Sequence, residues 1–262
     1  MRVMISGATG KVGRHLPPAL ESAGIAAYRL SRRPRDEPGW IQADMDQPAS
    51  LAGALAGCHG LFFSVPFSDA MGERAGRLLE AARSSGVRHI VRLSAWRAGD
   101  LPDNRMAVLH GEIDARVRAC GVPFTILRCN SFWQNLTEMY WPMMVRLGVL
   151  AVPEGDAPQA FVDAREIAEA AARAFARPDD FVGQTLDLAG PEVLTYSEAL
   201  ARLNQQHGTA FQVRQISADE ATAGYRRFGL SDNEIDVLLS LARSLARGDM
   251  ARAAGTGQAP AS

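Results

Sequence analysis

The sequence predicts a doubly wound α/β fold, in which a mainly parallel sheet is covered by helices on both faces. Three observations lead to this expectation. Short apolar runs alternate with amphipathic stretches over the first 130 residues, the connections between them are short, and a glycine-rich turn follows the first run. Such alternation implies right-handed crossovers and strands that are buried on both faces.

The expected strands are short apolar runs bounded by glycine, proline or polar residues. In the first half of the chain they cover residues 3–5, 26–30, 40–43, 60–65, 89–93 and 124–127. Apolar positions at helical spacing predict helices over residues 12–23, through Arg74, Leu78, Leu79 and Ala82, and over residues 107–119.

The pattern changes after about residue 130, where a helix rich in Trp, Met and Tyr is expected over residues 131–147. Short strands are expected around Phe161 and over residues 185–188, and further helices over residues 165–176, 196–205, 218–228 and 232–247. We therefore predict three regions: a dinucleotide-binding domain over residues 1–130, to which later segments return; a smaller, mostly helical substrate-cleft portion over residues 131–250; and a flexible tail over residues 251–262.

The composition indicates an ordinary globular protein. Of 262 residues, 47% are hydrophobic and 22% are charged, and the net charge of −1 argues against a nucleic-acid or anionic-membrane surface. Cys58, Cys120 and Cys129 lack CxxC spacing, so we expect neither a metal site nor a disulfide framework. This cysteine usage fits a reduced, cytoplasmic compartment best. We expect no signal peptide, because residues 1–6 enter a strand directly without a charged n-region and an apolar h-region, and no spanning helix, because no apolar run approaches ~18 residues.

The strongest functional signal is GATGKVG at residues 7–13, which follows a strand and opens an expected helix. Gly7 permits a tight turn, Gly10 lets the backbone approach a pyrophosphate, and Gly13 lets the helix pack against the strand. The N-terminus of that helix offers free N–H groups to phosphates. The alternative is a glycine-rich turn without a ligand. The expected cofactor contacts are Gly7, Thr9, Gly10, Lys11, Val12 and Gly13.

The end of the second strand indicates which dinucleotide is bound. NAD-binding sites place an Asp or Glu there, whereas this chain has Arg32 and Arg33 and no acid before Asp36. A guanidinium paired with the 2′-phosphate makes charge-assisted bonds worth roughly 1.5–3 kcal/mol each. We therefore expect NADP(H), the alternative being a solvated basic turn.

Residues that follow three other strands are expected to line the cofactor channel, because ligands of such sheets lie outside the carboxyl ends of the strands. For each, an ordinary loop residue is the alternative. These residues are Asp44, Met45, Ser64, Val65, Pro66, Ser94, Ala95 and Trp96.

Several segments in this order resemble the NmrA-like, atypical branch of the short-chain dehydrogenase/reductase superfamily. They are GATGKVG, SRRP, HGEID before GVPFTILR, NSFWQN, FVDAREIA and AGPEVLTY, and they span nearly all of the chain before the tail. The resemblance implies a Rossmann-type domain, NADP(H), and a cleft closed by the C-terminal portion. Members of the family include quinone reductases, dye and aryl-ether reductases, and redox-sensing regulators that bind the dinucleotide without catalysis.

The chain departs from the superfamily at its Tyr-x-x-x-Lys motif, in which the lysine lowers the pKa of the tyrosine and holds the nicotinamide ribose. Alignment by the downstream segment puts Met106 in the tyrosine position and His110 in the lysine position. Lys11 is the only lysine in the chain and belongs to the glycine loop. The usual acid–base mechanism for alcohols and ketones is therefore excluded.

Two residues are candidates for catalysis. His110 is expected either as a ribose ligand or as a proton donor, against a helix-surface histidine. Asn130, just past the sixth strand, is expected to bond substrate or nicotinamide, against a structural role. An apolar wall for a flat substrate is expected from Phe132, Trp133, Tyr140, Trp141, Met143 and Met144, together with Trp96, although such a stripe is also typical of a core.

The leading hypothesis is an NADPH-dependent reductase of a small planar acceptor: a quinone, an imine or iminium, or an enone. Such acceptors delocalise charge themselves, and the cofactor carries the chemistry. The alternative is a non-catalytic NADP(H) redox sensor, and a weaker one is an isomerase or epimerase. The expected partner is a small molecule; a homodimer stays open.

Overall fold

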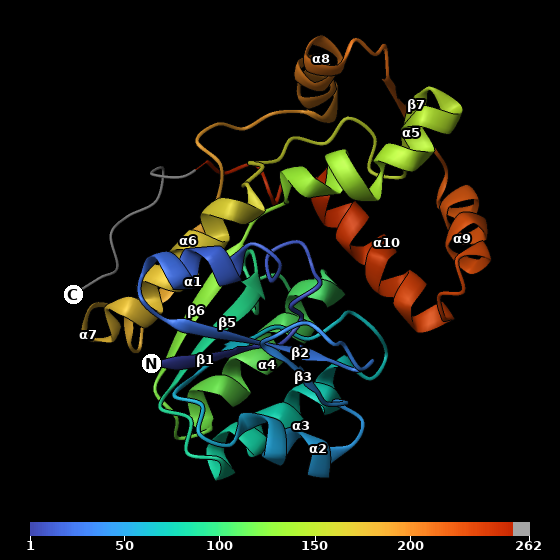
Figure 1. The fold of residues 1–262 in the computed structure, drawn as a ribbon. Helices are drawn as coiled ribbons and strands as arrows, with labels where there is room; N and C mark the ends of the chain where they lie inside the picture. Colours follow the sequence, from blue (N-terminus) through green and yellow to red (C-terminus); the bar gives the residue numbers. More distant parts are fainter. Residues whose placement is uncertain (254–262) are drawn as a thin grey trace. The chain divides into compact units, whose positions relative to one another are not determined.

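A computed structural model describes residues 1–253 and divides them into two compact units (Figure 1). The first unit comprises residues 1–98, 109–128 and 164–186, and the second comprises residues 99–108, 129–163 and the described residues from 187 onward. Residues 99–108 therefore group with the second unit, and residues 164–186 return to the first. Most of the tail expected over residues 251–262 lies outside the described residues.

A seven-stranded sheet with the order β3-β2-β1-β4-β5-β6-β8 confirms the predicted α/β fold. Its strands are β1 (Arg2–Ile5), β2 (Ala26–Ser31), β3 (Trp40–Gln42), β4 (Gly60–Phe63), β5 (His89–Ala95), β6 (Phe124–Cys129) and β8 (Thr185–Leu188). The β1–β2, β1–β4, β2–β3 and β4–β5 pairs are parallel. The strand order reverses between β1 and β4, and ligands of such sheets bind at that switch point.

Helices cover both faces of the sheet (Figure 1). The helices are α1 (Leu16–Ser22) and α6 (Ala164–Ala176) on one face, and α2 (Pro48–Leu55), α3 (Met71–Ser84) and α4 (Arg105–Ala119) on the other; α7 (Pro178–Phe181) follows α6. Side chains alternate between the faces along a strand. In β4, Leu61 and Phe63 join the cluster beneath α2 and α3, whereas a Cβ at Gly60 would lie 2.7 Å from the ring of Phe175 in α6. The absence of a side chain at Gly60 therefore allows Phe175 of α6 to pack directly on β4.

The first helix starts later than the sequence predicts. Residues 6–9 and 11–15 form turns on either side of a bend at Gly10, and α1 begins at Leu16 instead of Val12. Pro17 and Pro18 have no backbone N–H and cannot donate to the carbonyls of the preceding turn, so the regular helical ladder is interrupted before them. The N–H groups nearest to Gly7 consequently belong to a turn and not to the helix.

The second unit contains a two-stranded parallel sheet of β7 (Val149–Val152) and β9 (Gln212–Gln215), with α5 (Trp141–Leu147), α8 (Tyr196–His207), α9 (Ala218–Arg227) and α10 (Asp232–Ala246) (Figure 1). The single helix predicted over residues 131–147 is wrong. A π-helical turn, Asn135–Met139, precedes α5, with the amide of Tyr140 bonded to the carbonyl of Asn135. Pro142, which lacks an N–H, accounts for the break.

Other differences have local causes. The strand predicted around Phe161 is reduced to isolated bridges, Phe132 with Val162 and Gln159 with Leu194. Helix α2 and strands β7 and β9 were not predicted; they have only eight, four and four residues, and in segments this short the apolar pattern does not separate helix from strand. Among the described residues, no helix is long and apolar enough to cross a membrane.

Candidate functional site

The glycine loop has the close backbone contacts that its sequence predicts. Gly7 has a positive φ of 66°, and its carbonyl accepts a hydrogen bond from the amide of Gly10 at 2.9 Å. A Cβ at Gly13 would lie 2.2 Å from the oxygen of Gly7, whereas a Cβ at Gly10 would lie 3.1 Å from that same oxygen. Gly13 is therefore required by the loop itself, and the exposed Gly10 leaves the outer side of the loop open to a ligand.

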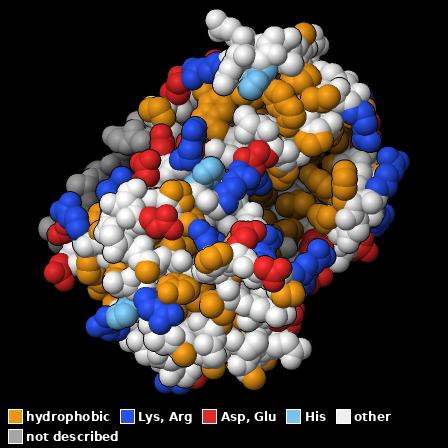
Figure 2. Space-filling model, viewed as in Figure 1, with side chains coloured by type: hydrophobic (Ala, Val, Ile, Leu, Met, Phe, Trp, Pro, Cys, Tyr) orange, Lys and Arg blue, Asp and Glu red, His pale blue; other side chains and the backbone are white. Residues whose placement is uncertain are grey.

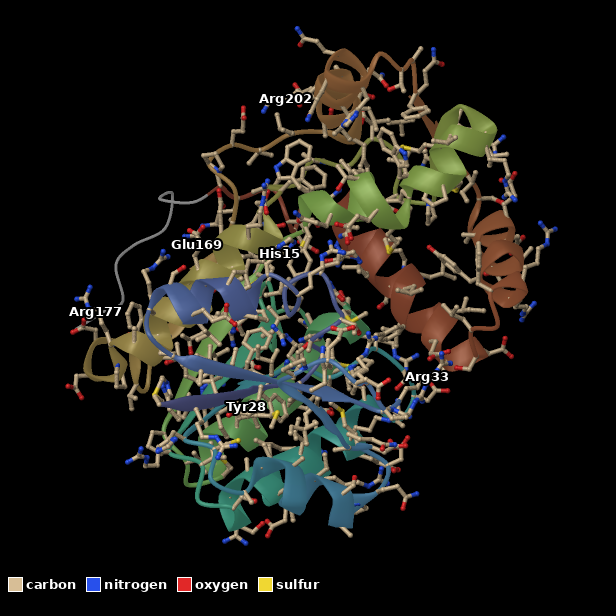
Figure 3. All side chains as sticks on the ribbon, in the orientation of Figure 1. His15, Tyr28, Arg33, Glu169, Arg177 and Arg202 are labelled. Carbon is tan, nitrogen blue, oxygen red and sulfur yellow. The ribbon has the colours of Figure 1, made fainter. Side chains whose placement is uncertain are left out.

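A cavity of ≈460 Å³ lies beside this loop in the first unit, at the carboxyl ends of β1, β2 and β3. Its lining residues are Gly7, Ala8, Thr9, Leu30, Ser31, Arg32, Arg33, Arg35, Ala43, Asp44, Met45, Asp46, Pro66 and Arg74. Figure 3 shows Arg33 beyond the end of β2. The glycine loop and the basic turn thus border one cavity, and arginines outnumber aspartates in its lining four to two.

The arginines of this cavity differ in how they are held. Arg74 makes a two-pronged ion pair with Asp46, with Nε–Oδ1 and Nη2–Oδ2 distances of 2.9 and 2.6 Å. That hydrogen bond, with nearby Arg77 and Arg32, lowers the pKa of Asp46 despite some desolvation. Within residues 1–253, Arg32 and Arg33 form no ion pair, and both are exposed. The guanidinium groups of Arg32 and Arg33 are therefore accessible to an anionic ligand.

The remaining residues predicted to contact the cofactor do not line this cavity. Val12 and Val65 are buried, and Lys11 and Ser64 are half-buried. A Cβ at Gly7 would lie 3.0 Å from the hydroxyl of Ser64, so the residue that follows β4 packs directly against the glycine loop. Ala95 is half-buried at the end of β5, and Ser94 is buried and bonded internally.

His110 belongs to a buried polar cluster formed by β5, β6 and α4. Its Nδ1 lies 3.2 Å from Nη2 of Arg92. The guanidinium of Arg92 also faces Asp114, with Nε–Oδ1 at 3.7 Å, and Arg128 faces the other carboxylate oxygen at 3.5 Å. That oxygen accepts a 2.8 Å hydrogen bond from the hydroxyl of Ser94.

Charge and burial shift the pKa values in this cluster. Desolvation, reinforced by the charge of Arg92, lowers the pKa of His110 to about 3. Burial raises the pKa of Asp114, against the opposing effects of Arg92, the Ser94 hydroxyl and Arg128. His110 is consequently neutral at physiological pH. Helix α4 contains neither tyrosine nor lysine, and Met106 occupies its first turn.

Asn130 is buried in the second unit, and both ends of its amide make internal hydrogen bonds. Its Nδ2 donates to the carbonyl of Met250 at 3.0 Å, and its Oδ1 accepts from the amide of Ser131 at 2.7 Å. This arrangement favours the structural alternative for Asn130 over contact with a substrate.

The aromatic residues predicted for a substrate wall differ in exposure. In the second unit Phe132, Trp133 and Tyr140 are half-buried, and Trp133 packs on Phe161 with a ring separation of 5.2 Å. Trp96, in the first unit, is 5% exposed. The other members of the stripe also differ: Trp141 packs on His207 and Phe211, Met144 is fully buried, and Met143 is half-buried.

A second buried polar group was not predicted from the sequence. The carboxylate of Glu154, 8% exposed, accepts a 2.8 Å hydrogen bond from the hydroxyl of Tyr196. Burial raises the pKa of Glu154, and burial, followed by the charge of Glu154, raises the pKa of Tyr225 to about 12. Burial, with the same charge next, also raises the pKa of Tyr140. All four groups belong to the second unit.

A groove of ≈590 Å³ lies between α1 and α6, where Figure 3 labels His15 and Glu169, but it contains neither the glycine loop nor the basic turn. Among the described residues, no group of three or more His, Cys, Asp or Glu side chains is arranged to hold a metal ion. Figure 2 shows charged side chains of both signs interspersed over the visible face. The cavity beside the glycine loop therefore remains the candidate dinucleotide site.

Among the residues that the sequence analysis did not predict for the cavity or for the His110 cluster, four charged side chains stand out: Asp46, Arg74, Arg92 and Asp114. Asp46 directly follows the predicted pair Asp44 and Met45, so its position was a usable signal. Asp114 lies one helical turn after His110, in the segment HGEID, and that spacing also offered a signal. Arg74 and Arg92 reach the cavity and the cluster only through the fold, and no local pattern marks them.

Comparisons with known proteins give a consistent result. The chain matches the model of the NmrA-like family over residues 1–226. It is 31% identical over 227 residues to a (4-alkanoyl-5-oxo-2,5-dihydrofuran-3-yl)methyl phosphate reductase of Streptomyces griseus, covering 84% of this chain and 78% of the relative. It is 26% identical over 248 residues to an NAD(P)H azoreductase of Xenophilus azovorans, covering 91% and 85%. The structure of an Escherichia coli NADPH-dependent quinone oxidoreductase complexed with NADPH has a TM-score of 0.78 at 24% identity, covering 96% and 92%.

Proposed function

This chain belongs to the NmrA-like family, and on that basis we propose that it is an NADPH-dependent reductase of a small planar acceptor, namely a quinone, an imine or iminium, or an enone. The observation that carries the proposal is the cavity in which the glycine loop and the exposed pair Arg32 and Arg33 meet. A dinucleotide phosphate needs close backbone approach at one end and positive charge at the other, and this cavity provides both.

The proposed cofactor contacts combine this lining with the rest of the glycine loop, of which only residues 7–9 line the cavity. The turn from Gly7 to Gly13 would hold the pyrophosphate, and Arg32 and Arg33 the 2′-phosphate. Asp44 and Met45 would border the adenine. Bound NADPH supplies the hydride, while the chain's own residues bind and orient the cofactor.

The acceptor class is supported by the relatives and by what α4 lacks. The names of the similar proteins describe reduction of an oxo-dihydrofuran carrying an alkanoyl group, an azo compound and a quinone. Helix α4 carries no Tyr–Lys pair to protonate an alkoxide. A conjugated acceptor suits such a site, since it spreads the added charge over its own π-system and needs little help from a protein acid.

A non-catalytic NADP(H) sensor is the second candidate, and the missing Tyr–Lys pair is the observation that favours it. Both candidates require the same dinucleotide site and a small-molecule ligand. The three cysteines are free, which is compatible with the reducing cytoplasm that we propose as the location.

The test is calorimetric titration of the purified protein with NADPH, NADH and NADP⁺, followed by a panel of quinones, azo dyes, iminium dyes and enones. Oxidation of NADPH is followed by the absorbance of the reduced nicotinamide. We expect NADPH to bind more tightly than NADH, and at least one acceptor to be reduced.

The outcomes separate the two candidates. Tight NADPH binding without turnover of any acceptor would reject the reductase and favour the sensor. Absence of dinucleotide binding would reject both, because both depend on the cavity beside the glycine loop.

A further inference from the structure

The loop over residues 32–39, between β2 and β3, brings a third arginine to the dinucleotide cavity. Arg35 lines the same ≈460 Å³ cavity as Arg32 and Arg33. Its side chain is exposed, and it forms no ion pair within residues 1–253. Its guanidinium carbon lies 4.4 Å from the centre of the ring of Trp40, the first residue of β3. Arg35 is therefore held on an aromatic ring while it borders the cavity.

Contact over a ring face holds a guanidinium without using its hydrogen-bond donors. The five N–H groups of arginine lie in the plane of the guanidinium and point outward, so they stay available when the flat face is occupied. Arg74, in contrast, directs two of its nitrogens at the carboxylate of Asp46, at 2.9 and 2.6 Å. Arg35 is consequently restrained and still able to donate to an anion.

Trp40 is fixed at its edge and along its backbone. Its indole Nε1 donates a 3.2 Å hydrogen bond to the carboxylate of Glu37, in the same loop as Arg35. In the parallel pairing of β2 with β3, the backbone of Trp40 lies opposite Arg29. The indole thus binds an acidic side chain at its edge and a guanidinium over its face. The carboxylate of Glu37 is thereby engaged by the ring and not by Arg35.

A second arginine on the same ring lies outside the cavity. The guanidinium carbon of Arg29 is 5.7 Å from the ring centre of Trp40, and its Nη1 donates to the carbonyl of Pro38 at 3.4 Å. Arg29 is not among the residues that line the cavity, whereas Arg35 is. One arginine on this ring therefore supports the loop, and the other borders the ligand site.

We propose that Trp40 positions Arg35 as a third guanidinium for the 2′-phosphate of bound NADPH. A phosphate monoester has three terminal oxygens that accept hydrogen bonds, so three arginines of one loop match its acceptors. The proposal rests on the proposed dinucleotide site and extends it, since preference for NADPH over NADH then depends on Trp40, which does not itself line the cavity. Arg35 is a cofactor ligand, and Trp40 and Glu37 are positioning residues.

The ligand role of Arg35 is tested by calorimetry with NADPH, NADH and adenosine 2′,5′-bisphosphate, which carries the 2′-phosphate without the nicotinamide. We expect Arg35→Met to bind NADPH and the bisphosphate about five- to tenfold more weakly and NADH as tightly as the wild type. Arg29→Met is the matched control, because it removes a guanidinium from the same ring but not from the cavity. Equal losses in the two variants, or an equal loss for NADPH and NADH, would overturn the ligand role.

The positioning role of Trp40 is tested by a double-mutant cycle. Trp40→Leu removes the aromatic face and should weaken binding of the bisphosphate about two- to fivefold while Arg35 is present. In Arg35→Met the same substitution should cause no further loss, because the guanidinium that the ring holds is gone. Losses that add in the double variant would overturn the positioning role. If Trp40→Leu does not fold, Trp40→Phe, whose ring attracts a cation less strongly, takes its place in the cycle.

The indole N–H of Trp40 supplies a readout that a merely structural role would not move. Trp40→Phe identifies its ¹⁵N–¹H resonance, which we expect to shift when adenosine 2′,5′-bisphosphate is added to the wild type. The shift should be lost in Arg35→Met at a bisphosphate concentration that saturates the variant. A shift of the same size in both proteins would show that Arg35 does not link the ring to the phosphate.

These outcomes separate the proposal from the function on which it rests. Tight NADPH binding that is unchanged in Arg35→Met overturns the role of Arg35 and leaves the proposed reductase standing. Failure of the wild type to bind either NADPH or the bisphosphate overturns both.

Discussion

At the scale of single residues, the choice of dinucleotide depends on Arg32 and Arg33. Their guanidinium groups are exposed beside the cavity and form no ion pair within residues 1–253. Arg74, in contrast, is engaged by Asp46. An incoming phosphate therefore meets two exposed guanidinium groups and does not have to break an ion pair within the described residues.

The double variant Arg32→Ala, Arg33→Ala should weaken NADPH binding by about ten- to a hundredfold, because it removes charge-assisted bonds to the 2′-phosphate. NADH binding should hardly change, and calorimetry measures both. Arg83→Ala, which removes an exposed arginine paired with Glu80 on α3, is the matched control. An equal loss for NADPH and NADH would show that the basic turn does not contact the phosphate.

Glu154 gives a prediction about pH. Burial raises its pKa in the folded protein above the ordinary value of 4.5. At a pH between the ordinary pKa and the raised pKa, Glu154 holds a proton in the folded state that it has lost in the unfolded state. The contribution of Glu154 to the free energy of unfolding therefore falls as pH rises. Glu154→Gln still accepts a hydrogen bond from Tyr196 but does not titrate.

The free energy of unfolding of Glu154→Gln, relative to the wild type, should therefore increase from about pH 4 to about pH 7. Urea unfolding at several pH values measures this difference. The raised pKa of Asp114 affects the wild type and Glu154→Gln equally, so its contribution cancels in the difference between their free energies of unfolding. A difference that is constant with pH would mean that Glu154 titrates normally in the folded protein.

At the scale of elements, the glycine loop separates the needs of folding from those of binding. A Cβ at Gly13 would lie 2.2 Å from a backbone oxygen that cannot move without distorting the turn. A Cβ at Gly10 would lie 3.1 Å from the same oxygen and would point to the exposed side of the loop. The two glycines therefore serve different needs, one of folding and one of binding.

Gly13→Ala should destabilise the protein by about 2 kcal/mol or more, as expected for overpacking. Gly10→Ala should cost less than about 1 kcal/mol and should chiefly weaken NADPH binding. Thermal unfolding and calorimetry measure the two effects, with each variant serving as the control for the other. Similar losses of stability in both would contradict this division of roles.

The elements that were predicted correctly are those with a long or continuous apolar pattern, such as β4 and α3. The elements that were misplaced depend on backbone chemistry that the pattern does not reveal. Proline at positions 17, 18 and 142 removes hydrogen bonds and shifts or interrupts a helix that the apolar spacing alone continues.

At the scale of the whole molecule, ligand binding should appear as a change in thermal stability. At a concentration one hundred times its dissociation constant, a ligand that binds only the folded state stabilises it by about 2.7 kcal/mol. For a chain of this size that corresponds to a rise in Tm of roughly 5–10 °C.

NADPH should therefore raise the Tm, and the double variant Arg32→Ala, Arg33→Ala should lose the rise at the same NADPH concentration. Calorimetry resolves whether one or two transitions occur. If the two units unfold separately, only the transition of the unit with the glycine loop should shift. An identical shift in the double variant would place the binding site elsewhere.

The sequence by itself determined the fold class, the glycine loop, the basic turn and the family, because each is written in local spacing: apolar periods, glycines three residues apart, and arginines where a strand ends. Only the tertiary structure decided that Arg74 and Asp46 join the basic turn at one cavity, and that Arg92 contacts both His110 and Asp114, which also faces Arg128. Those residues lie far apart in the sequence, on α3, β5, α4, β6 and a turn before α2, and only packing of the sheet against α3 and α4 brings them together. Burial, which sets the protonation of His110 and Glu154, likewise exists only once the chain has folded.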